Sequence, residues 1–187
     1  MLSPDFNPFP VLETPRLLLR EHNYIDAEIL FTMRTDENIM RYIDRQRPKD
    51  IQDIRNFISA FTEDCRAGKS IAWVIALKEQ PDFMIGSIGY WRSDLANHRA
   101  EVGYMLQPDF WRRGIISEAL EHVIDFGFEQ INLHTIQANI NPGNEASRQM
   151  LLKHGFLKEA YFREDYYFNG KFLDSEIYGL INPQHKK

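Results

Sequence analysis

The stretch from Glu101 to Ser117 holds the residues whose types and spacing best suggest chemistry. Its letters are EVGYMLQPDFWRRGIIS, a β-rich run that ends at Leu106, a short loop, and a helical pattern that begins near Gly114. The first N–H groups of a helix have no intrahelical partners and lie at the positive end of the helix dipole, so they bind anions. Glycine permits close backbone approach, and Arg112 and Arg113 add positive charge. The segment therefore predicts a phosphate site, although short loops with one glycine and two solvated arginines are also common.

Other polar residues in the chain form no recognisable site. His98 and His154 are isolated, and no cluster of His, Cys and Asp has the spacing of metal ligands. The chain also lacks the Gly-x-Ser-x-Gly pattern of a nucleophilic serine. We therefore expect no metal and no covalent intermediate on a serine.

The size and charge of the chain limit the classes of function that it can have. Its 187 residues fit one domain with a substantial core, and 22 Lys and Arg against 27 Asp and Glu give a net charge of −5. A nucleic-acid binder needs clustered positive charge to displace counterions, so we expect no nucleic-acid partner. A mild negative charge suits a cationic acceptor molecule, but it is equally ordinary for a soluble bacterial-type protein.

The single cysteine and the apolar segments favour a cytoplasmic protein. Cys65 ends an apolar series at helical spacing that begins at Ile51, so we expect it to be a buried side chain and not a nucleophile. No basic patch precedes an apolar run in the first twelve residues, and no apolar stretch approaches the roughly 20 residues of a transmembrane helix. We expect no signal peptide and no membrane partner.

Strand-like and helix-like segments alternate along the chain. β-rich or alternating runs predict strands at 16–21, 72–77, 84–91, 100–106, 135–140, 161–168 and 171–180. Apolar residues at helical spacing predict helices at 25–33 and 39–43, from Pro48 through Cys65, from Gly114 through Phe128, and in a segment that ends at Lys153. Asn169-Gly170 predicts a hairpin turn, and Gly155 a helix end. With no repeat or linker, we expect one domain over residues 1–187, with a core from about 11 to 181 and loose termini.

Several phrases in this order resemble the GNAT superfamily of N-acetyltransferases, and in particular its ribosomal-protein branch of the RimJ/RimL type. They are LETPRLLLR at 12–20, GSIGYW at 86–91, AEVGYML at 100–106, NEAS at 144–147, KHGF at 153–156 and YGL at 178–180. The resemblance spans nearly the whole chain. It implies an α/β fold with one mixed, mostly antiparallel twisted sheet, flanked by helices and splayed between the fourth and fifth strands, 100–106 and 135–140. It also implies acetyl-CoA as the acetyl donor.

The phosphate motif of this superfamily is kept only in part. Its pattern is Gln or Arg, two residues, Gly, one residue, then Gly or Ala. Trp111, Gly114 and Ile116 stand at these three places, so only the central glycine is retained. A large residue at 116 is expected to add bulk beside the pyrophosphate. The resemblance assigns cofactor binding to the seven residues Trp111, Arg112, Arg113, Gly114, Ile115, Ile116 and Ser117.

The resemblance also implies a site for the pantetheine arm of the cofactor. The arm is expected to lie like a short strand beside 100–106, held by backbone groups around Met105 and Leu106, with the acetyl group where the two strands splay apart. Asn144 matches the family asparagine that hydrogen-bonds the pantetheine. Asparagine is also a good N-cap for the helix that follows, and the two roles are compatible.

Glu101 is the candidate general base, because the resemblance puts a site-facing carboxylate at this position. The attacking nitrogen must be neutral, and a carboxylate removes its proton directly or through water. The alternative is a carboxylate that is solvated or paired with Arg99.

The candidate general acid is Ser147, because the usual residue is missing. Many family members have an acid tyrosine five residues before the phenylalanine of the closing Gly-Phe. Counting back from Phe156 gives Leu151, which cannot donate a proton. Ser147 is the nearest hydroxyl in the resembling motif, although a serine in the first helical turn often bonds to the backbone. A coenzyme A thiol is acidic enough that no dedicated acid is strictly required.

The expected function is transfer of an acetyl group from acetyl-CoA to a primary amine, by direct attack in a ternary complex. The RimJ/RimL resemblance suggests a protein N-terminus as acceptor, such as that of a ribosomal protein, with a monomeric or homodimeric enzyme. Polyamines and aminoglycoside-like amines are alternative acceptors. A non-catalytic acyl-CoA-binding or interaction module is the alternative class, kept open by Leu151 and Ile116.

Overall fold

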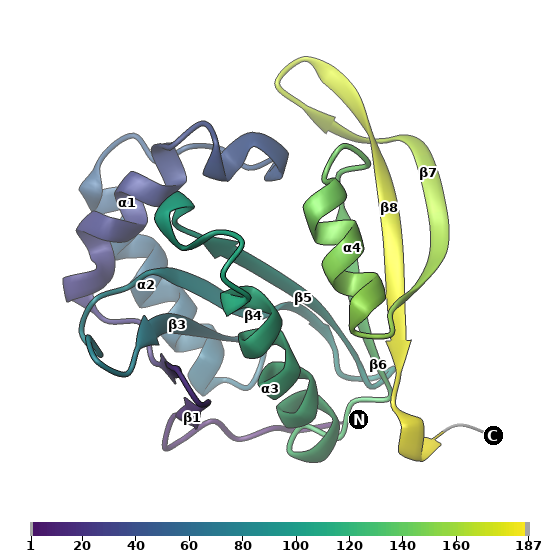
Figure 1. Cartoon of the computed structure of the whole chain (residues 1–187), viewed down its shortest axis with the longest axis horizontal. Helices are drawn as coiled ribbons and strands as arrows, with labels where there is room; N and C mark the ends of the chain where they lie inside the picture. The colour runs from purple at the N-terminus through teal and green to yellow at the C-terminus, as the bar shows by residue number, and fades with distance from the viewer. Residues whose placement is uncertain (1, 186–187) are drawn as a thin grey trace.

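Eight strands form one mixed sheet in the computed structural model, which describes residues 2–185 (Figure 1). The strands are β1 (Leu12–Glu13), β2 (Leu17–Arg20), β3 (Ile71–Leu77), β4 (Gly86–Asp94), β5 (Arg99–Leu106), β6 (Thr135–Ile140), β7 (Leu157–Phe168) and β8 (Lys171–Ile181). Their order across the sheet is β1-β2-β3-β4-β5-β6-β8-β7. Only β5 and β6 pair in parallel; the other neighbours are antiparallel. The sheet predicted from the family resemblance is confirmed.

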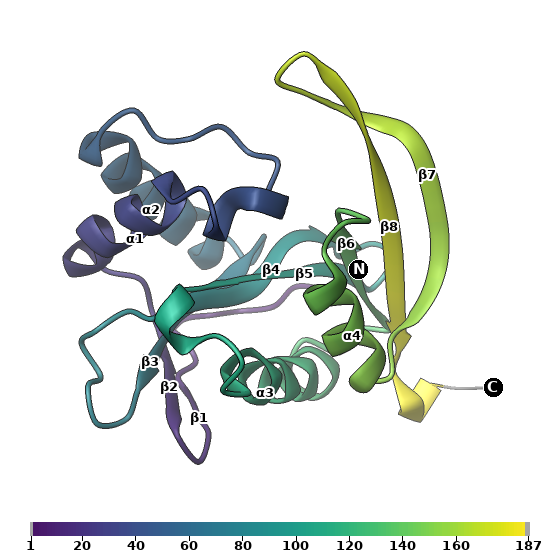
Figure 2. The same cartoon turned by 45° about the horizontal axis from the view of Figure 1, so that its top comes forward.

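Helices cover both faces of this sheet. The α-helices are α1 (Ala27–Thr35), α2 (Ile51–Arg66), α3 (Ile115–Glu129) and α4 (Glu145–Lys153). Short 3-10 helices are η1 (Tyr24–Asp26), η2 (Ile39–Tyr42), η3 (Pro108–Phe110) and η4 (Pro183–His185). Figure 2 shows α1 and α2 on one face and α3 on the other, with α4 beside β6 and β8. No helix within residues 2–185 is long and apolar enough to cross a membrane.

Two apolar clusters follow from this layering. The larger lies between the sheet and α3 and includes the fully buried Trp73, Leu120 and Val123. The smaller joins α1 and α2 to the sheet through residues such as Leu30, Ile54 and Val74. Alternation along β5 divides its side chains between these clusters, because successive residues of a strand point to opposite faces.

The predicted stripe of α2 is confirmed as the buried face of that helix. Ile54, Ile58 and Cys65 are buried, while Ile51 and Phe61 are partly exposed. The helix begins at Ile51 and not at Pro48, because the Asp50 side chain accepts a hydrogen bond from the Asp53 N–H and so caps the helix there. Burial raises the pKa of the Cys65 thiol to about 11, which agrees with a core residue and not a nucleophile.

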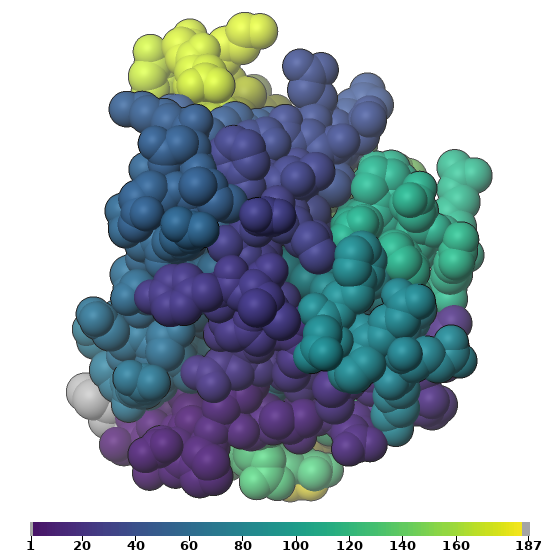
Figure 3. All heavy atoms as spheres, turned by 90° about the vertical axis from the view of Figure 1, so that its left-hand side faces the viewer, coloured from purple at the N-terminus to yellow at the C-terminus, as the bar shows by residue number. Residues whose placement is uncertain are grey.

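The β7–β8 hairpin extends beyond the body of the sheet (Figures 1 and 2). Its turn is the predicted Asn169-Gly170, and both residues have positive φ. Strand β7 begins at Leu157, four residues before the predicted start at 161, because Leu157, Lys158 and Ala160 also pair with β8. In the view onto the α1–α2 side, the purple and blue residues of the N-terminal third form the left and centre of the surface, teal and green residues lie on the right, and the yellow hairpin lies at the top (Figure 3).

The described residues of the N-terminal segment pack against the core, where the sequence analysis expected a loose terminus. Phe6 is 5 % exposed and packs against Phe126, with 6.3 Å between ring centroids. The Trp73 indole N–H donates to the carbonyl of Pro10 at 2.6 Å. At the other end Pro183–His185 form a 3-10 turn, and residues 186–187 of the predicted tail lie outside the described residues. The sequence pattern missed these contacts because isolated aromatic residues have no periodicity.

Candidate active site

The parallel strands β5 and β6 pair only at their beginnings. Their register is Arg99 with Thr135, Ala100 with Ile136 and Glu101 with Gln137, and it ends there. Strand β5 continues to Leu106 and β6 to Ile140, so the last residues of the two strands separate. The predicted splay between 100–106 and 135–140 is thus present.

A cavity of about 510 Å³ lies at this splay. Its lining comes from β4, β5, β6, the start of α4, the α1–η2 region and the β7–β8 hairpin. Among the residues predicted for the site, it contains Glu101, Met105, Asn144 and Ser147. Two segments that are distant in the sequence therefore share one cavity.

The edge of β5 that faces the cavity has unpaired backbone groups. The Gln107 N–H donates to the Ile85 carbonyl at 2.8 Å, and hydrogen-bonded pairs alternate along an antiparallel ladder. The backbone groups of Tyr104 and Leu106 consequently point away from β4 and toward the splay. The Leu106 carbonyl is taken by the Trp111 indole N–H at 2.8 Å. Met105 stands opposite Ser87 in the β4 ladder, so it offers the cavity its side chain and not its backbone.

Tyr104 and Ser147 meet across the splay through a hydrogen bond between their hydroxyl groups. Ser147 is 5 % exposed, and its N–H donates to the Asn144 side-chain oxygen at 3.1 Å. Asn144 is therefore the N-cap of α4, as its position in the sequence predicted. Burial raises the pKa of Tyr104, partly offset by the hydrogen bond with Ser147, so the phenol keeps its proton at neutral pH.

Tyr104 is the residue that the sequence analysis missed. It lies on the same face of β5 as Val102 and Leu106, at every second position, which is the pattern of a packing residue. Leu151, at the usual tyrosine position, is fully buried in the core. The chain therefore places a phenol in the cavity from β5, although the tyrosine expected from α4 is absent.

Glu101 lies on the opposite side of β5 from Tyr104. Its carboxylate pairs with Arg92 at 3.3 Å, and its side chain is 27 % exposed. The expected alternative partner, Arg99, pairs instead with Asp94 at 3.1 Å. Both Glu101 and Tyr104 line the cavity because the splay opens the sheet between its two faces.

The predicted phosphate loop has the geometry of an anion site. Gly114 is the residue before α3 and has φ of 74°. The first bond of the helix is from the Glu118 N–H to the Gly114 carbonyl at 3.0 Å, so the N–H groups of Ile115, Ile116 and Ser117 have no intrahelical partner. The Ile116 side chain is partly buried and packs against the larger core, and the expected bulk beside the pyrophosphate stays a prediction.

The charged groups around this loop are mostly exposed. Arg112 has a positive φ of 59°, and the Arg113 guanidinium lies 5.5 Å from the Phe110 ring centroid. The Ser117 hydroxyl lies 2.7 Å from the His154 imidazole Nε2. A second, open cavity of about 500 Å³ is lined by Pro15, Gly114, Ser117, Glu118, Glu121, His122 and Lys153. The helix start and this cavity lie at one end of the β5–α3 connection.

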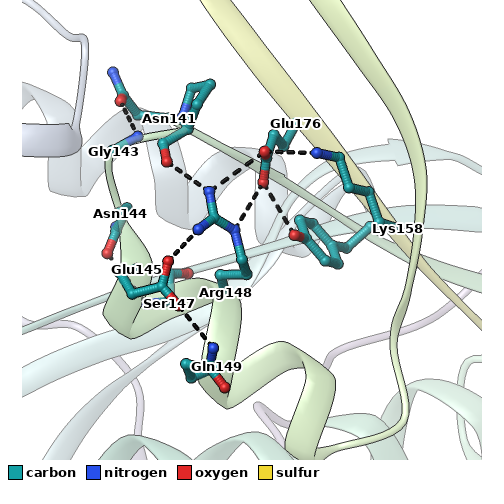
Figure 4. A network of polar contacts seen from close by, with 11 residues as sticks. Asn141, Gly143, Asn144, Glu145, Ser147, Arg148, Gln149, Lys158 and Glu176 are labelled. Carbon is teal, nitrogen blue, oxygen red and sulfur yellow. Dashed lines mark hydrogen bonds and ion pairs between the residues drawn. The ribbon is translucent and has the colours of Figure 1, made fainter.

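A buried ionic network holds the start of α4 in place (Figure 4). The Arg148 guanidinium donates to the carboxylate of Glu176 at 3.1 Å and to the Pro142 carbonyl at 2.6 Å. Glu176 is 4 % exposed and also accepts from Lys158 at 2.6 Å and from the Tyr178 hydroxyl at 3.0 Å. Burial alone would raise the pKa of Glu176, but these donors outweigh it and lower the pKa. The network ties the turn that carries Asn144 and Ser147 to β7 and β8.

Comparison with known proteins shows where this architecture occurs. Residues 16–157 match the family model described as an acetyltransferase (GNAT) domain. The chain is similar to the uncharacterized N-acetyltransferase YoaA of Bacillus subtilis (strain 168), with 34 % identity over 176 residues, 94 % of this chain and 99 % of that protein. Two solved structures have the same fold with a TM-score of 0.83. One is RimJ of Mycobacterium smegmatis with a CoA-disulfide, at 20 % identity over 95 % of this chain and 89 % of that one. The other is RimL, a ribosomal L7/L12 alpha-N-protein acetyltransferase with coenzyme A, at 18 % identity over 92 % and 98 %.

Proposed function

The chain belongs to the acetyltransferase (GNAT) family, and from that membership we propose that it transfers the acetyl group of acetyl-CoA to a primary amine by direct attack, with both substrates bound. The observation that carries the proposal is the cavity at the splay of β5 and β6, which brings Glu101, Tyr104 and Ser147 together. A carboxylate and a protonated phenol in one cavity can serve both proton transfers of the reaction.

The chain offers a fitting set of groups for acetyl-CoA. The Tyr104 backbone groups and the Leu106 N–H, which point away from β4, suit an extended pantetheine arm, because a strand edge pairs with any chain that has alternating donors and acceptors. The N–H groups at the start of α3 suit the pyrophosphate. Trp111, Arg112 and Arg113 are the nearby side chains assigned to the same role. Acetyl-CoA, when bound, supplies the activated acetyl group.

Direct attack joins the acceptor nitrogen to the acetyl carbonyl carbon and breaks the bond from that carbon to sulfur. The proton that leaves the nitrogen passes to the Glu101 carboxylate, directly or through water. The sulfur takes a proton from the Tyr104 phenol, whose hydrogen bond with Ser147 sets its direction. Ser147 thus acts together with Tyr104 as the acid, and no acid is needed at Leu151.

The proposed acceptor is the α-amine of a protein, such as a ribosomal protein. An α-amine with a pKa near 8 needs only about 1.4 kcal/mol to become neutral at pH 7, whereas a lysine amine needs about 4.6 kcal/mol. An α-amine therefore demands less of the Glu101 carboxylate, which pairs with Arg92, than a lysine amine does. The similar structure of RimL, a ribosomal L7/L12 alpha-N-protein acetyltransferase, points in the same direction, although that likeness by itself shows only the fold.

Two measurements on one sample test the proposal. Titration calorimetry measures acetyl-CoA binding, and a thiol reagent then follows release of coenzyme A with peptides, polyamines and aminoglycosides as acceptors. Binding with acceptor-dependent release is the expected result. Binding without release from any acceptor would favour a non-catalytic acyl-CoA-binding module, and absence of binding would refute the assigned cofactor site.

A further inference from the structure

The active-site cavity is lined by charged side chains of both signs. Three arginines line it, Arg34, Arg45 and Arg92, together with four carboxylates, Asp44, Glu101, Asp165 and Asp174. Asp165 and Asp174 come from the β7–β8 hairpin, and Arg34 comes from α1. The cavity therefore has an acidic wall and a basic wall, which a purely cationic acceptor does not explain.

The carboxylates of the hairpin already have donors from the protein. Asp165 accepts a hydrogen bond from the Ser175 hydroxyl at 2.7 Å. Asp174 accepts from the Tyr161 hydroxyl at 2.5 Å and from the Glu164 N–H at 2.9 Å. These contacts account for both carboxylates without any ligand.

The guanidinium of Arg34 has no such partner. It makes no ion pair and no hydrogen bond with residues 2–185, and its one contact is with the Phe57 ring, 4.5 Å from the ring centroid. Arg34 is partly buried, and burial together with the charges of Arg45 and Arg47 lowers its pKa. A partly desolvated cation without an anion is costly, so an anionic group of a ligand would stabilise it.

His22 is a second polar side chain without a partner in the same cavity. It is 6 % exposed, and neither ring nitrogen has a hydrogen-bond partner within residues 2–185. Its ring packs on Phe61 with 6.0 Å between centroids. Burial lowers its pKa to about 4, so the ring is neutral at pH 7 and offers one donor and one acceptor. Buried polar groups are nearly always hydrogen-bonded, because an unmade hydrogen bond destabilises the fold, so this residue is an exception to explain.

Aromatic rings complete this part of the cavity. Phe57 and Trp91 lie with 6.2 Å between ring centroids, and both line the cavity beside His22 and Arg34. We call these four residues the α1 subsite. Apolar rings lower the local dielectric, which strengthens an ion pair between a ligand and Arg34.

We infer that the α1 subsite binds an anionic group of the acceptor, so that the acceptor is a primary amine that carries a carboxylate in the same molecule. Arg34 would bind that carboxylate through its planar guanidinium, and His22 would donate its ring N–H. The inference rests on the proposed function and narrows its acceptor class to an α-amino acid or an acidic peptide N-terminus. A polyamine is disfavoured, because an ammonium group at this wall would meet the unpaired charge of Arg34.

Acceptors in matched pairs test this inference through the kcat/KM of thiol release. The pairs are serine with serinamide, and C-terminally amidated peptides beginning Ser-Asp with those beginning Ser-Asn; spermidine is added. We expect one acidic member to exceed its neutral partner at least tenfold. A preference for serine would identify a free amino acid, and a preference for Ser-Asp would identify a peptide end. Equal rates within both pairs, or a preference for spermidine, would overturn the inference while leaving the acetyltransferase proposal intact.

Substitutions then connect the preference to the subsite. Arg34→Gln should reduce the ratio between acidic and neutral acceptors to nearly one, by lowering only the rate with the acidic member, and Arg34→Lys should restore part of it. Arg41→Gln is the matched control, because Arg41 is exposed and does not line the cavity. A ratio unchanged in Arg34→Gln would refute the subsite. Absence of release from every acceptor would refute the proposed function and this inference with it.

Discussion

The hydroxyl groups of Tyr104 and Ser147 share a hydrogen bond although the two residues are 43 positions apart in the chain. Tyr104 comes from β5 and Ser147 from the first turn of α4, and both line the cavity where β5 separates from β6. Burial keeps the phenol protonated, so the pair joins a proton donor to a hydroxyl that orients it.

Removing the phenol should therefore slow turnover and leave cofactor affinity nearly unchanged. We expect Tyr104→Phe to lower kcat by about 10²-fold, the low end of general acid catalysis. Ser147→Ala should lower it less, and the double variant should be no slower than Tyr104→Phe, because the two residues act as one unit. Steady-state thiol release and calorimetry measure the two quantities. Additive losses would show that the two hydroxyl groups act separately.

Glu101→Gln tests the base. The variant should lower kcat/KM more than tenfold at pH 7. This deficit should shrink as the pH rises toward the pKa of the acceptor amine, where more of the amine is already neutral. Acetyl-CoA affinity should stay within a few-fold of the unmodified protein. Asp94→Asn is a suitable control, since Asp94 also pairs with an arginine but does not line the cavity. A wild-type rate in Glu101→Gln would remove this carboxylate from the mechanism.

Gly114→Val tests the phosphate site at the start of α3. An added Cβ would meet only the Arg16 guanidinium, at an ordinary 3.6 Å, so space does not require glycine there. The φ of 74° does, because a β-branched residue is strained in that region by about 1–2 kcal/mol. We expect at least tenfold weaker acetyl-CoA binding by calorimetry. Gly114→Asn, which tolerates this conformation, should bind more tightly than Gly114→Val; equal affinity in all three proteins would contradict the site.

His22 should make stability depend on pH. Its pKa is about 4 in the folded protein and near 6.5 when exposed, so between these values the unfolded chain binds the additional proton. Stability contributed by the neutral ring is complete above pH 6.5 and is lost as the pH falls toward 4, by about 3 kcal/mol. Urea unfolding at pH 7 and pH 4.5 should show a larger loss for the unmodified protein than for His22→Gln. Parallel losses in both proteins would mean that His22 is not buried as a neutral ring.

Local patterns predicted most of the fold, since periodicity records which side of an element faces the core. The apolar stripe that ends at Cys65, the Asn169-Gly170 turn and the helix beginning after Gly114 all depend on neighbours in the chain. Pairing between residues that are distant in the chain does not depend on such neighbours, so local patterns did not predict it. Arg99 was the partner considered for Glu101 in the alternative reading, but Asp94 stands opposite Arg99 in the β4–β5 ladder and pairs with it, while Arg92 stands opposite Glu101.

The sequence by itself determined the family resemblance, the order of elements, and the presence of Glu101, Asn144 and Ser147 in the segments that meet at the site. Only the tertiary structure decided which groups face one another there. Tyr104 looks like a packing residue until α4 brings Ser147 to it. Arg34 and His22 look like ordinary helix and loop residues until the fold places them beside the cavity, Arg34 partly buried and His22 buried, with no hydrogen-bond partner for either side chain among residues 2–185. The physical reason is that hydrogen bonding and desolvation depend on three-dimensional neighbours, whereas sequence periodicity reports only which face of each element is buried.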